Sequence, residues 1–491
     1  MKKIIVSKLF LYRHRFMIGY IVLGLAFVGL LFGLPLIAQT GLSEAEMDSA
    51  VISHALDFNA PLDGDLVDLP YHLLQKFSIA TLGLTPYAIK LPSVIIGLLL
   101  GLLLILLLNR WFKNNVSLLA SCLVVLSTPF LFLAGSGTPL IMLVFWPTLL
   151  LWLGSKIYGE ARPQPKYSFF FAIAMLLSIF TPYMIYFAIF CVVFVAMQPH
   201  LRFIVKNLPK PMLILAALII LGGAALLITN VVNQPGTIME ILFARDFDGH
   251  GVFSNIWSGL APVFSWRGQV GGVFLAPLMS LPLFALTLIG LFSTTKGFFA
   301  SRNSIASLLI IFTLIISGFN PKAIIFFILP ITILAAHGLK YLLEKWYGLF
   351  PENPYARISA LLPLTILFSV MIVPSLLQYL YGYRYNPQIA NEFYYDLSII
   401  RDNLTDEVLV VDEHYDFYKI LEESSDLTVL PSDSQYLAGS VAILRGETEA
   451  LENYSLNRII TSPMRENSDI IYLYTVKGEQ HGSDDGPNEA D

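Results

Sequence analysis

The stretch GLSEAEMDSAVISHALDFNAPLDGDLVDLPYHLLQKFSIATLGLTPYAIKLPS covers residues 41–93. It carries the densest set of acidic residues in the first half of a chain that is otherwise poor in charge. Long apolar segments lie on both sides of it, and each is long enough to cross a lipid bilayer. The pattern predicts an acidic loop held between two membrane spans.

The composition places the chain among polytopic membrane proteins. Of its 491 residues 56% are hydrophobic and 13% are charged, whereas a soluble domain carries about 25% charged residues. The mean hydropathy is +0.69. Cys122 and Cys191 both fall in apolar segments, which favours small buried hydrophobes over a disulfide framework. No phosphate-binding loop, dinucleotide loop or zinc-type spacing is present, so we expect no nucleic-acid partner and assign no cofactor with certainty.

Eleven apolar segments are candidate spans, because about 20 apolar residues are needed to cross the hydrocarbon core. The first follows a basic N-terminus and is too long for a cleaved signal segment. Thr181-Pro182 alone separates the fifth from the sixth. The eleven segments are about 16–38, 90–109, 116–134, 139–155, 168–181, 183–198, 211–232, 271–292, 304–319, 323–340 and 359–381.

The distribution of basic residues predicts the orientation. With the N-terminus in the cytoplasm, the inside segments carry eighteen Lys and Arg residues. The outside segments before the C-terminal region carry five, which are Lys76, Lys90, Arg245, Arg267 and Lys322. This bias follows the positive-inside rule. An odd number of spans then places the C-terminus outside, in a multi-pass protein of the plasma membrane.

Three outside segments are long enough to contribute to a site. The first loop, 40–89, ends in a stretch from His72 whose apolar and polar residues suit a helix lying in the interface. The second outside loop is 233–270. Strand-like runs at 407–411, 427–430, 440–444, 458–461 and 470–476 alternate with polar stretches. We therefore expect a transmembrane domain over 1–381, a small extracytoplasmic α/β domain over 382–478, and a disordered acidic tail over 479–491.

The distribution of charge along the spans bears on function. The spans contain no Asp, Glu, Lys or Arg well inside them, which argues against an ion-coupled transporter. The charge lies at the outer ends of the spans instead. Chemistry at the outer interface, on a substrate whose tail stays in the lipid, fits this distribution.

The first loop also has a recognisable order of residues. It opens with Ser43-Glu44-Ala45-Glu46, continues with Asp68-Leu69-Pro70-Tyr71-His72, and leads through Gly83 into Lys90-Leu91-Pro92-Ser93. Later, Lys322 precedes an apolar run that reaches Leu329-Pro330. Over about residues 15–110 this order resembles the GT-C superfamily of membrane glycosyltransferases, in its protein mannosyltransferase and aminoarabinose transferase branch. The resemblance implies an α-helical polytopic fold and a polyprenyl-phosphate sugar donor.

One residue departs from the family pattern. The family opens the loop with Asp-Glu, and here Ser43 stands in place of the Asp while Glu44 keeps the Glu. The resemblance implies an acidic general base that takes the proton of the acceptor hydroxyl. Glu44, Glu46 and Asp48 are the candidates. On a helix Glu44 and Asp48 share a face and Glu46 points away, so we expect Glu44 to act, with Asp48 as the second candidate.

Other readings of the loop stay open. Ser43 and Glu46 have the spacing of a capping box, which is compatible with catalysis because the cap would fix the helix that aims Glu44. Asp68 precedes the Pro-Tyr-His stretch and is a candidate, with Tyr71 and His72, for binding sugar, acceptor or phosphate. A solvated turn carboxylate and an interface histidine without a role are the alternatives. No metal ligand set is assigned, although the outside carboxylates could hold a divalent cation.

A leaving polyprenyl phosphate needs cations to stabilise its charge. The outside basic residues form the candidate set, and snorkelling at the bilayer surface is the alternative for those next to spans, Lys90 and Lys322. His250 is a further candidate because glycines flank it in the second outside loop. The set is Lys76, Lys90, Arg245, His250, Arg267 and Lys322.

The sequence therefore predicts an integral-membrane, inverting glycosyltransferase of the hexosyltransferase type. It would move a monosaccharide from polyprenyl phosphate to an extracytoplasmic glycan, lipid or protein. A glycolipid-binding relative without activity is one alternative, since Ser43 replaces the family Asp. A flippase or transporter of lipid-linked glycans is another, but it predicts buried charges and internal repeats that the sequence lacks.

Overall fold

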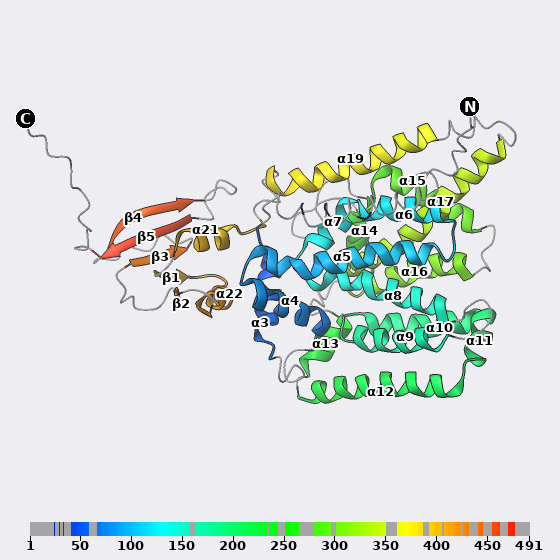
Figure 1. Cartoon of the computed structure of the whole chain (residues 1–491), viewed down its shortest axis with the longest axis horizontal. Helices are drawn as coiled ribbons and strands as arrows, with labels where there is room; N and C mark the ends of the chain where they lie inside the picture. The colour runs from blue at the N-terminus through cyan, green and yellow to red at the C-terminus, as the bar shows by residue number, and fades with distance from the viewer. Residues whose placement is uncertain are drawn as a thin grey trace, which may run out of the picture.

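The computed structural model describes most of the chain between Gly41 and Val476. The described residues are 24, 29, 33, 41–57, 66–157, 164–233, 235–243, 251–264, 278–295, 301–349, 361–385, 392–404, 407–423, 426–431, 440–444, 454–461 and 470–476. They form an elongated helical bundle with a small sheet beyond one of its ends (Figure 1).

Two short helices begin the well-described part of the chain and lie at the sheet-facing end of the bundle. They are α3 (Glu44–Ala55) and α4 (Leu69–Leu82). Gly83 has a positive φ of 73° and ends α4, and α5 starts at Pro86 with Thr85 as its cap. The expected interface helix therefore stops before Ile89, which belongs to α5.

The bundle itself runs from α5 to α19. Its helices are α5 (Pro86–Leu108), α6 (Asn114–Val125), α7 (Thr128–Gly135), η2 (Pro139–Ile141), α8 (Met142–Ile157), α9 (Pro165–Ser178), α10 (Met184–Met197), α11 (Pro199–Lys206), α12 (Lys210–Asn233), α13 (Gly236–Phe243), α14 (Val252–Phe264), α15 (Leu281–Thr295), α16 (Ser301–Ser317), η3 (Pro321–Phe327), α17 (Ile328–Leu349) and α19 (Leu361–Tyr385).

Many of these helices are suited to a membrane. Within the described residues, five are long and apolar enough to cross a bilayer, and the number rises to seven if two bent pairs each count as one span. The bends are 67° between α6 and α7 and 100° between α10 and α11. Three shorter apolar helices, in α9, α15 and α16, fall below the length of a span. The chain is thus a mostly helical membrane protein.

The predicted spans overlap helices in the described residues, although 116–134 is divided by the bend between α6 and α7. Ten of the eleven segments, from 90–109 onward, overlap the helices just named. The first segment, 16–38, lies almost entirely outside the described residues. The total of eleven crossings stays a prediction, because length and composition support five to seven.

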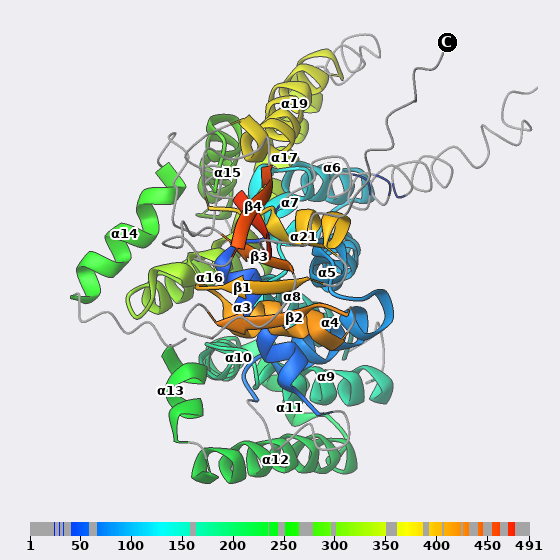
Figure 2. The ribbon, with the colours of Figure 1, turned by 90° about the vertical axis from the view of Figure 1, so that its left-hand side faces the viewer.

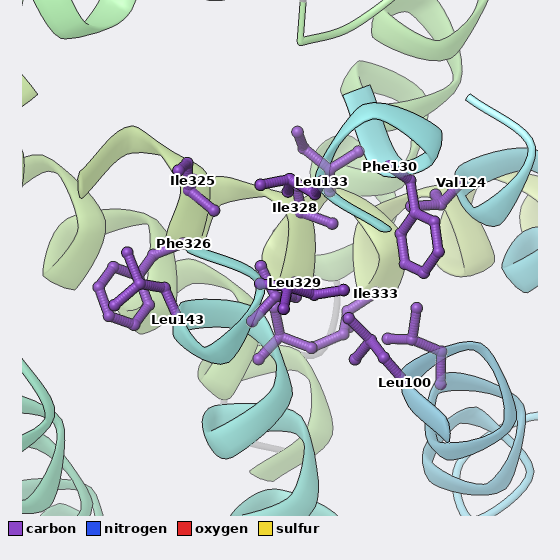
Figure 3. Close-up of a cluster of buried hydrophobic side chains, with 14 of the residues drawn as sticks. Leu100, Val124, Phe130, Leu133, Leu143, Ile325, Phe326, Ile328, Leu329 and Ile333 are labelled. Carbon is purple, nitrogen blue, oxygen red and sulfur yellow. The ribbon is translucent and has the colours of Figure 1, made fainter. Parts of the chain in front are cut away.

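The core of the bundle is apolar and lies where α5, α6, α7, α8, η3 and α17 meet. Figure 3 shows this cluster, in which Leu100, Phe130 and Leu329 come from three different helices. Each of these three side chains is at most 2% exposed. Burial of this kind holds α5 in the bundle, and the N-terminal part of this helix carries Lys90 and Ser93 of the candidate site.

A mixed five-stranded sheet follows the bundle, in the order β2-β1-β3-β5-β4. The parallel strands are β1 (Val408–Val411), β2 (Thr428–Pro431) and β3 (Ser440–Leu444), whereas β5 (Ile470–Val476) pairs antiparallel with β3 and with β4 (Tyr454–Thr461). All five strand-like runs predicted from the sequence are strands. Three short helices accompany the sheet: α21 (Asp396–Asn403), α22 (Tyr415–Lys419) and η4 (Ile420–Glu423).

The sheet and α3 share one hydrophobic core. Leu42 and Met47, at the start of α3, belong to the same buried cluster as Leu409 of β1 and Phe417 of α22. Figure 1 places α3 and α4 at the end of the bundle nearest the sheet, and in Figure 2, seen from that end, they lie around β1 and β2 in the view. The helices α3 and α4 of the first loop therefore lie between the bundle and the sheet.

Candidate active site

The start of α3 is fixed by its own sequence. Ser43 is the N-cap and forms a capping box with Glu46, in which the Ser43 N–H donates to Glu46 Oε2 over 2.8 Å. This satisfies a backbone donor that the helix leaves free. The capping box predicted from the sequence is confirmed.

Glu46 also reaches into the bundle. Its side chain is only 1% exposed, and its Oε1 accepts a 2.6 Å hydrogen bond from the N–H of Gly137, in the turn between α7 and η2. The same oxygen lies 3.7 Å from Lys90 Nζ. A buried carboxylate is tolerated only with such partners, so Glu46 ties α3 to two parts of the bundle.

Lys90 completes this buried ion pair from α5. It is 3% exposed and donates to the carbonyl oxygen of Gly41 over 2.7 Å. Its ammonium also lies 5.9 Å from the centroid of the Phe393 ring, close enough for a cation–π contact. Lys90 is therefore a buried cation, and it does not have the water-exposed head of a snorkelling lysine.

Glu44 and Asp48 lie on the opposite side of α3. Both residues are exposed, as expected for positions four apart on one helical face. The first turn of α3 thus holds two carboxylates in different settings, with Glu46 buried and Glu44 open to solvent. Of these two, Glu44 is free to approach a substrate.

The inner face of α4 is polar. Gln75 is fully buried and accepts hydrogen bonds from Ser49 and Ser53 of α3, over 2.8 and 2.6 Å. Its amide nitrogen donates to the carbonyl oxygens of Ile89 and Gly137, over 3.0 and 2.8 Å. All four hydrogen-bonding positions of one amide are filled, which locks α3, α4, α5 and the turn at Gly137 together.

The outer face of the same helix is apolar. Leu74, Phe77 and Leu82 are 48%, 63% and 46% exposed. This arrangement reverses that of a helix on a soluble protein, whose apolar face points to the core. It fits a helix that lies against lipid at the membrane surface, as the sequence pattern predicts.

His72 lies inside this polar layer. Its Nδ1 is 2.8 Å from Ser53 Oγ, and burial lowers the pKa of the imidazole to about 4. The ring is therefore neutral near pH 7. Because Ser53 Oγ donates its hydrogen to Gln75 Oε1, the Nδ1–H of the neutral ring donates to Ser53 Oγ. A neutral histidine carries no charge for a phosphate.

Tyr71 and Asp68 lie beside His72 at the start of α4. Tyr71 is fully buried, and its hydroxyl is 2.8 Å from Ser93 Oγ of α5. Burial raises the pKa of the Tyr71 phenol, so the hydroxyl keeps its proton. Asp68 is the N-cap of α4 in a left-handed conformation, with φ at 50°, and is 7% exposed. Asp is one of the few residues besides glycine that adopt this region as single residues.

The remaining candidates are distributed differently. Lys76 donates from Nζ to the carbonyl oxygens of His54 and Leu56, at the C-terminal end of α3, where a cation also favours the helix dipole. Lys322 is exposed on η3. Arg245, His250 and Arg267 lie outside the described residues.

The structure also bears on a metal. No group of three or more His, Cys, Asp or Glu side chains suited to an ion occurs among the residues the structure describes. Within α3 the carboxylates are separated, with Glu46 buried and Glu44 and Asp48 exposed.

Sequence reasoning missed the residues that connect the site. Gln75, Ser49, Ser53 and Gly137 were not among the candidates. One available signal was the spacing of His72, Gln75 and Ser78, which places three polar residues on one side of an apolar helix. The other members come from distant parts of the chain and leave no local pattern.

The fold is shared with known membrane transferases. No family model matches the sequence, and neither does any curated protein. The structure is similar to ArnT from Cupriavidus metallidurans bound to undecaprenyl phosphate, with a TM-score of 0.58 and 12% identity, over 94% of this chain and 98% of that one. The apo form gives a TM-score of 0.55 and 13% identity, over 93% and 98%.

A second protein gives a weaker match of the same kind. The Archaeoglobus fulgidus oligosaccharyltransferase, in a complex with Zn and sulfate, matches with a TM-score of 0.51 and 12% identity, over 86% of this chain and 67% of that one. ArnT and this enzyme are both GT-C membrane glycosyltransferases. At such identities the likeness concerns the fold, and the GT-C resemblance expected from the first loop is confirmed at that level.

Proposed function

We propose, from the fold shared with ArnT, that this chain is an integral-membrane inverting glycosyltransferase. It would take a monosaccharide from a polyprenyl-phosphate donor and place it on an extracytoplasmic acceptor, which is a glycan, a lipid or a protein. The observation that carries the proposal is a match over almost the full length of both chains to a transferase bound to undecaprenyl phosphate. The distribution of charge supports it, because the first loop carries exposed carboxylates at one end of an apolar bundle.

In this proposal Glu44 is the general base. Its carboxylate takes the proton from the acceptor hydroxyl while that oxygen attacks the anomeric carbon of the sugar. The bond between this carbon and the phosphate oxygen breaks, and the polyprenyl phosphate leaves with the electron pair. Exposure of Glu44 in the first turn of a fixed helix supports this role, and Asp48, one turn further on the same face, is the second candidate.

The leaving phosphate requires cations or N–H donors. We assign this role to the outside basic residues, with Asp68, Tyr71 and His72 as contacts to sugar or acceptor and Ser43 beside the base. Lys90 is held by Glu46 and Gly41 in the structure, so it can serve the phosphate only by exchanging these partners. Lys322 is exposed on η3, so a ligand in the surrounding solvent can reach its side chain.

The orientation belongs to the same proposal. The N-terminus would face the cytoplasm, eleven spans would cross the membrane, and the sheet would lie outside the cell. α3, α4 and the sheet lie at one end of the bundle, and α11, which carries Arg202 and Lys206, lies at the other (Figure 1). This separation supports the positive-inside assignment.

Sugar transfer from a radiolabelled polyprenyl-phosphate hexose, by purified protein in lipid, tests the function. We expect Glu44→Gln to lower turnover by ~10²-fold or more, as for a lost general base. Ala45→Gln is the matched control, because it changes an exposed neighbour in the same turn without removing a carboxylate, and it should keep wild-type turnover. Asp48→Asn separates the two acidic candidates.

One result would favour a second function. The wild type could bind the lipid saturably and yet turn over none of a set of hexose donors. Ser43 would then be the reason, because it replaces the family Asp and serves as the cap of α3. The chain would be a glycolipid-binding relative without transferase activity.

A further inference from the structure

Leu42, two residues before α3, is paired with the segment that leads into the sheet. Leu42 and Tyr394 exchange both of their backbone hydrogen bonds, over 2.8 and 2.7 Å, as a single antiparallel bridge. They are separated by about 350 residues of sequence. The segment 392–395 thus lies directly against the start of the acidic loop.

Close approach at this bridge depends on glycine. A Cβ atom added at Gly41 would lie 2.6 Å from the carbonyl oxygen of Tyr394 and 3.2 Å from Cβ of Phe393. The first distance is shorter than any ordinary contact between nonbonded atoms. Any larger residue at position 41 must therefore displace the segment 392–395.

Every backbone polar group from the Gly41 carbonyl to the Ser43 carbonyl has a partner. Lys90 binds the Gly41 carbonyl, Tyr394 binds both groups of Leu42, and Glu46 binds the Ser43 N–H. The Ser43 carbonyl accepts the first hydrogen bonds of α3. These partners come from α5, from the segment before the sheet and from α3 itself, so the peptide units ahead of Glu44 have little freedom to rotate.

The rest of α3 is held as firmly. Gln75 binds Ser49 and Ser53 in its middle, and Lys76 binds two carbonyl oxygens at its end. In addition, His54 Nε2 lies 3.0 Å from a carboxylate oxygen of Glu423 in η4. The helix is fixed from the bundle and from the sheet at the same time.

We propose that the segment Phe393–Tyr394 is a clip that positions Glu44 for catalysis, with Gly41 and Lys90 as its positioning residues. The inference rests on the proposed function, because it deepens the role of the Glu44 carboxylate. The sheet then contributes to catalysis, because the bridge at Leu42 fixes the direction of the first turn of α3. None of these positioning residues needs to touch the sugar.

Gly41→Ala tests the clip with a change of one methyl group. Misplacing a reacting group by about 1 Å can cost ~10²-fold in rate, so we expect kcat to fall between ~10-fold and ~10²-fold. The KM for the donor should stay within about twofold, because the donor's contacts are unchanged. Gly222→Ala is the control, since an added Cβ there meets nothing within 4 Å, and it should match the wild type. A residue that only stabilises the fold would lower the active fraction and leave kcat per folded molecule unchanged.

A second measurement reports on position without activity. A spin label at residue 44, in Glu44→Cys with Cys122 and Cys191 replaced by Ala, should give the partly restricted spectrum of an exposed site on an ordered helix. The added change Gly41→Ala should make it mobile, while Gly222→Ala should not. The spin-label measurement needs no turnover, so it tests the clip even if the wild type is inactive. An inactive wild type would count against the proposed function and not against the clip.

Two results would overturn the clip. One is a folded Gly41→Ala protein whose amide protection at Leu42 and Tyr394 is lost while kcat stays at the wild-type value. The other is a label at position 44 whose mobility does not change. Loss of protection together with a fall in kcat and a mobile label would support it.

Discussion

The buried ion pair between Glu46 and Lys90 should show strong thermodynamic coupling. Its atoms are 3.7 Å apart, which corresponds to about 4.5 kcal/mol of attraction at an effective dielectric constant of 20. Lys90→Met removes the cation beside the Glu46 carboxylate, and Glu46→Gln removes the anion beside the Lys90 ammonium. Removing one partner of a buried pair costs ~3–5 kcal/mol. We expect the double variant to lose ~2–4 kcal/mol less than the sum of the two single variants.

Reversible unfolding in mixed micelles, followed by circular dichroism, gives these free energies. The chain contains a matched control in Lys340 and Glu344, whose charged atoms are also 3.7 Å apart but whose side chains are 32% and 64% exposed. Lys340→Met and Glu344→Gln should couple by ~0.5 kcal/mol or less, because water screens this pair. Each set of two single variants and their double variant forms a double-mutant cycle. Equal coupling energies in the two cycles would refute the view that burial strengthens the Glu46–Lys90 pair.

Two further predictions concern the polar layer of α4. Gln75→Leu should lower the free energy of unfolding by ~2–4 kcal/mol, because it leaves two hydroxyls and two carbonyl oxygens without this partner. Gln75→Glu keeps the acceptor but loses the two donors, so it should also destabilise the protein. Burial holds the pKa of His72 at about 4, against an ordinary 6.5, so between these pH values the unfolded chain binds a proton that the folded chain does not. Stability should fall by ~3 kcal/mol as the pH drops from 6.5 to 4, and pH-dependent unfolding of the wild type and of His72→Gln measures this loss.

Each of these has an outcome that contradicts it. A Gln75→Leu protein as stable as the wild type would mean that water takes the place of the amide. The polar layer on the inner face of α4 would then be accessible to solvent. For His72, equal slopes of stability against pH in the wild type and in His72→Gln would show that the imidazole is protonated with its ordinary pKa in the folded state.

Much of the fold follows from patterns of short range. The five strands of the sheet were predicted from apolar runs bounded by turn residues. Ten of the eleven apolar segments overlap helices, because both signals depend on neighbours in sequence. The capping box at Ser43 was predicted for the same reason. The apolar outer face of α4 could also be predicted, since it has helical spacing.

The candidate site was only partly predictable. Helical geometry predicts that Glu44 and Asp48 share one face of α3 and that Glu46 points away from it. In the structure Glu44 and Asp48 are exposed and Glu46 is buried, as expected. The partners of Glu46 do not follow, because Lys90 and Gly137 are 44 and 91 positions away. Snorkelling was the alternative for Lys90, because nothing near it in the sequence indicates that it will be buried beside a carboxylate. Pairing of Leu42 with Tyr394 depends on tertiary structure alone.

The reversed polarity of α4 has a consequence for biosynthesis. Gln75 finds its last acceptor at Gly137, which leaves the ribosome 62 residues later. Until α5, α6 and α7 have entered the membrane, the polar side of α4 has no such partner and is better solvated by water. We expect α4 to wait at the membrane surface, with the acidic loop unformed, and to dock only afterwards. A photo-crosslinker at position 75 should therefore reach residue 137 only in arrested chains that extend well beyond it.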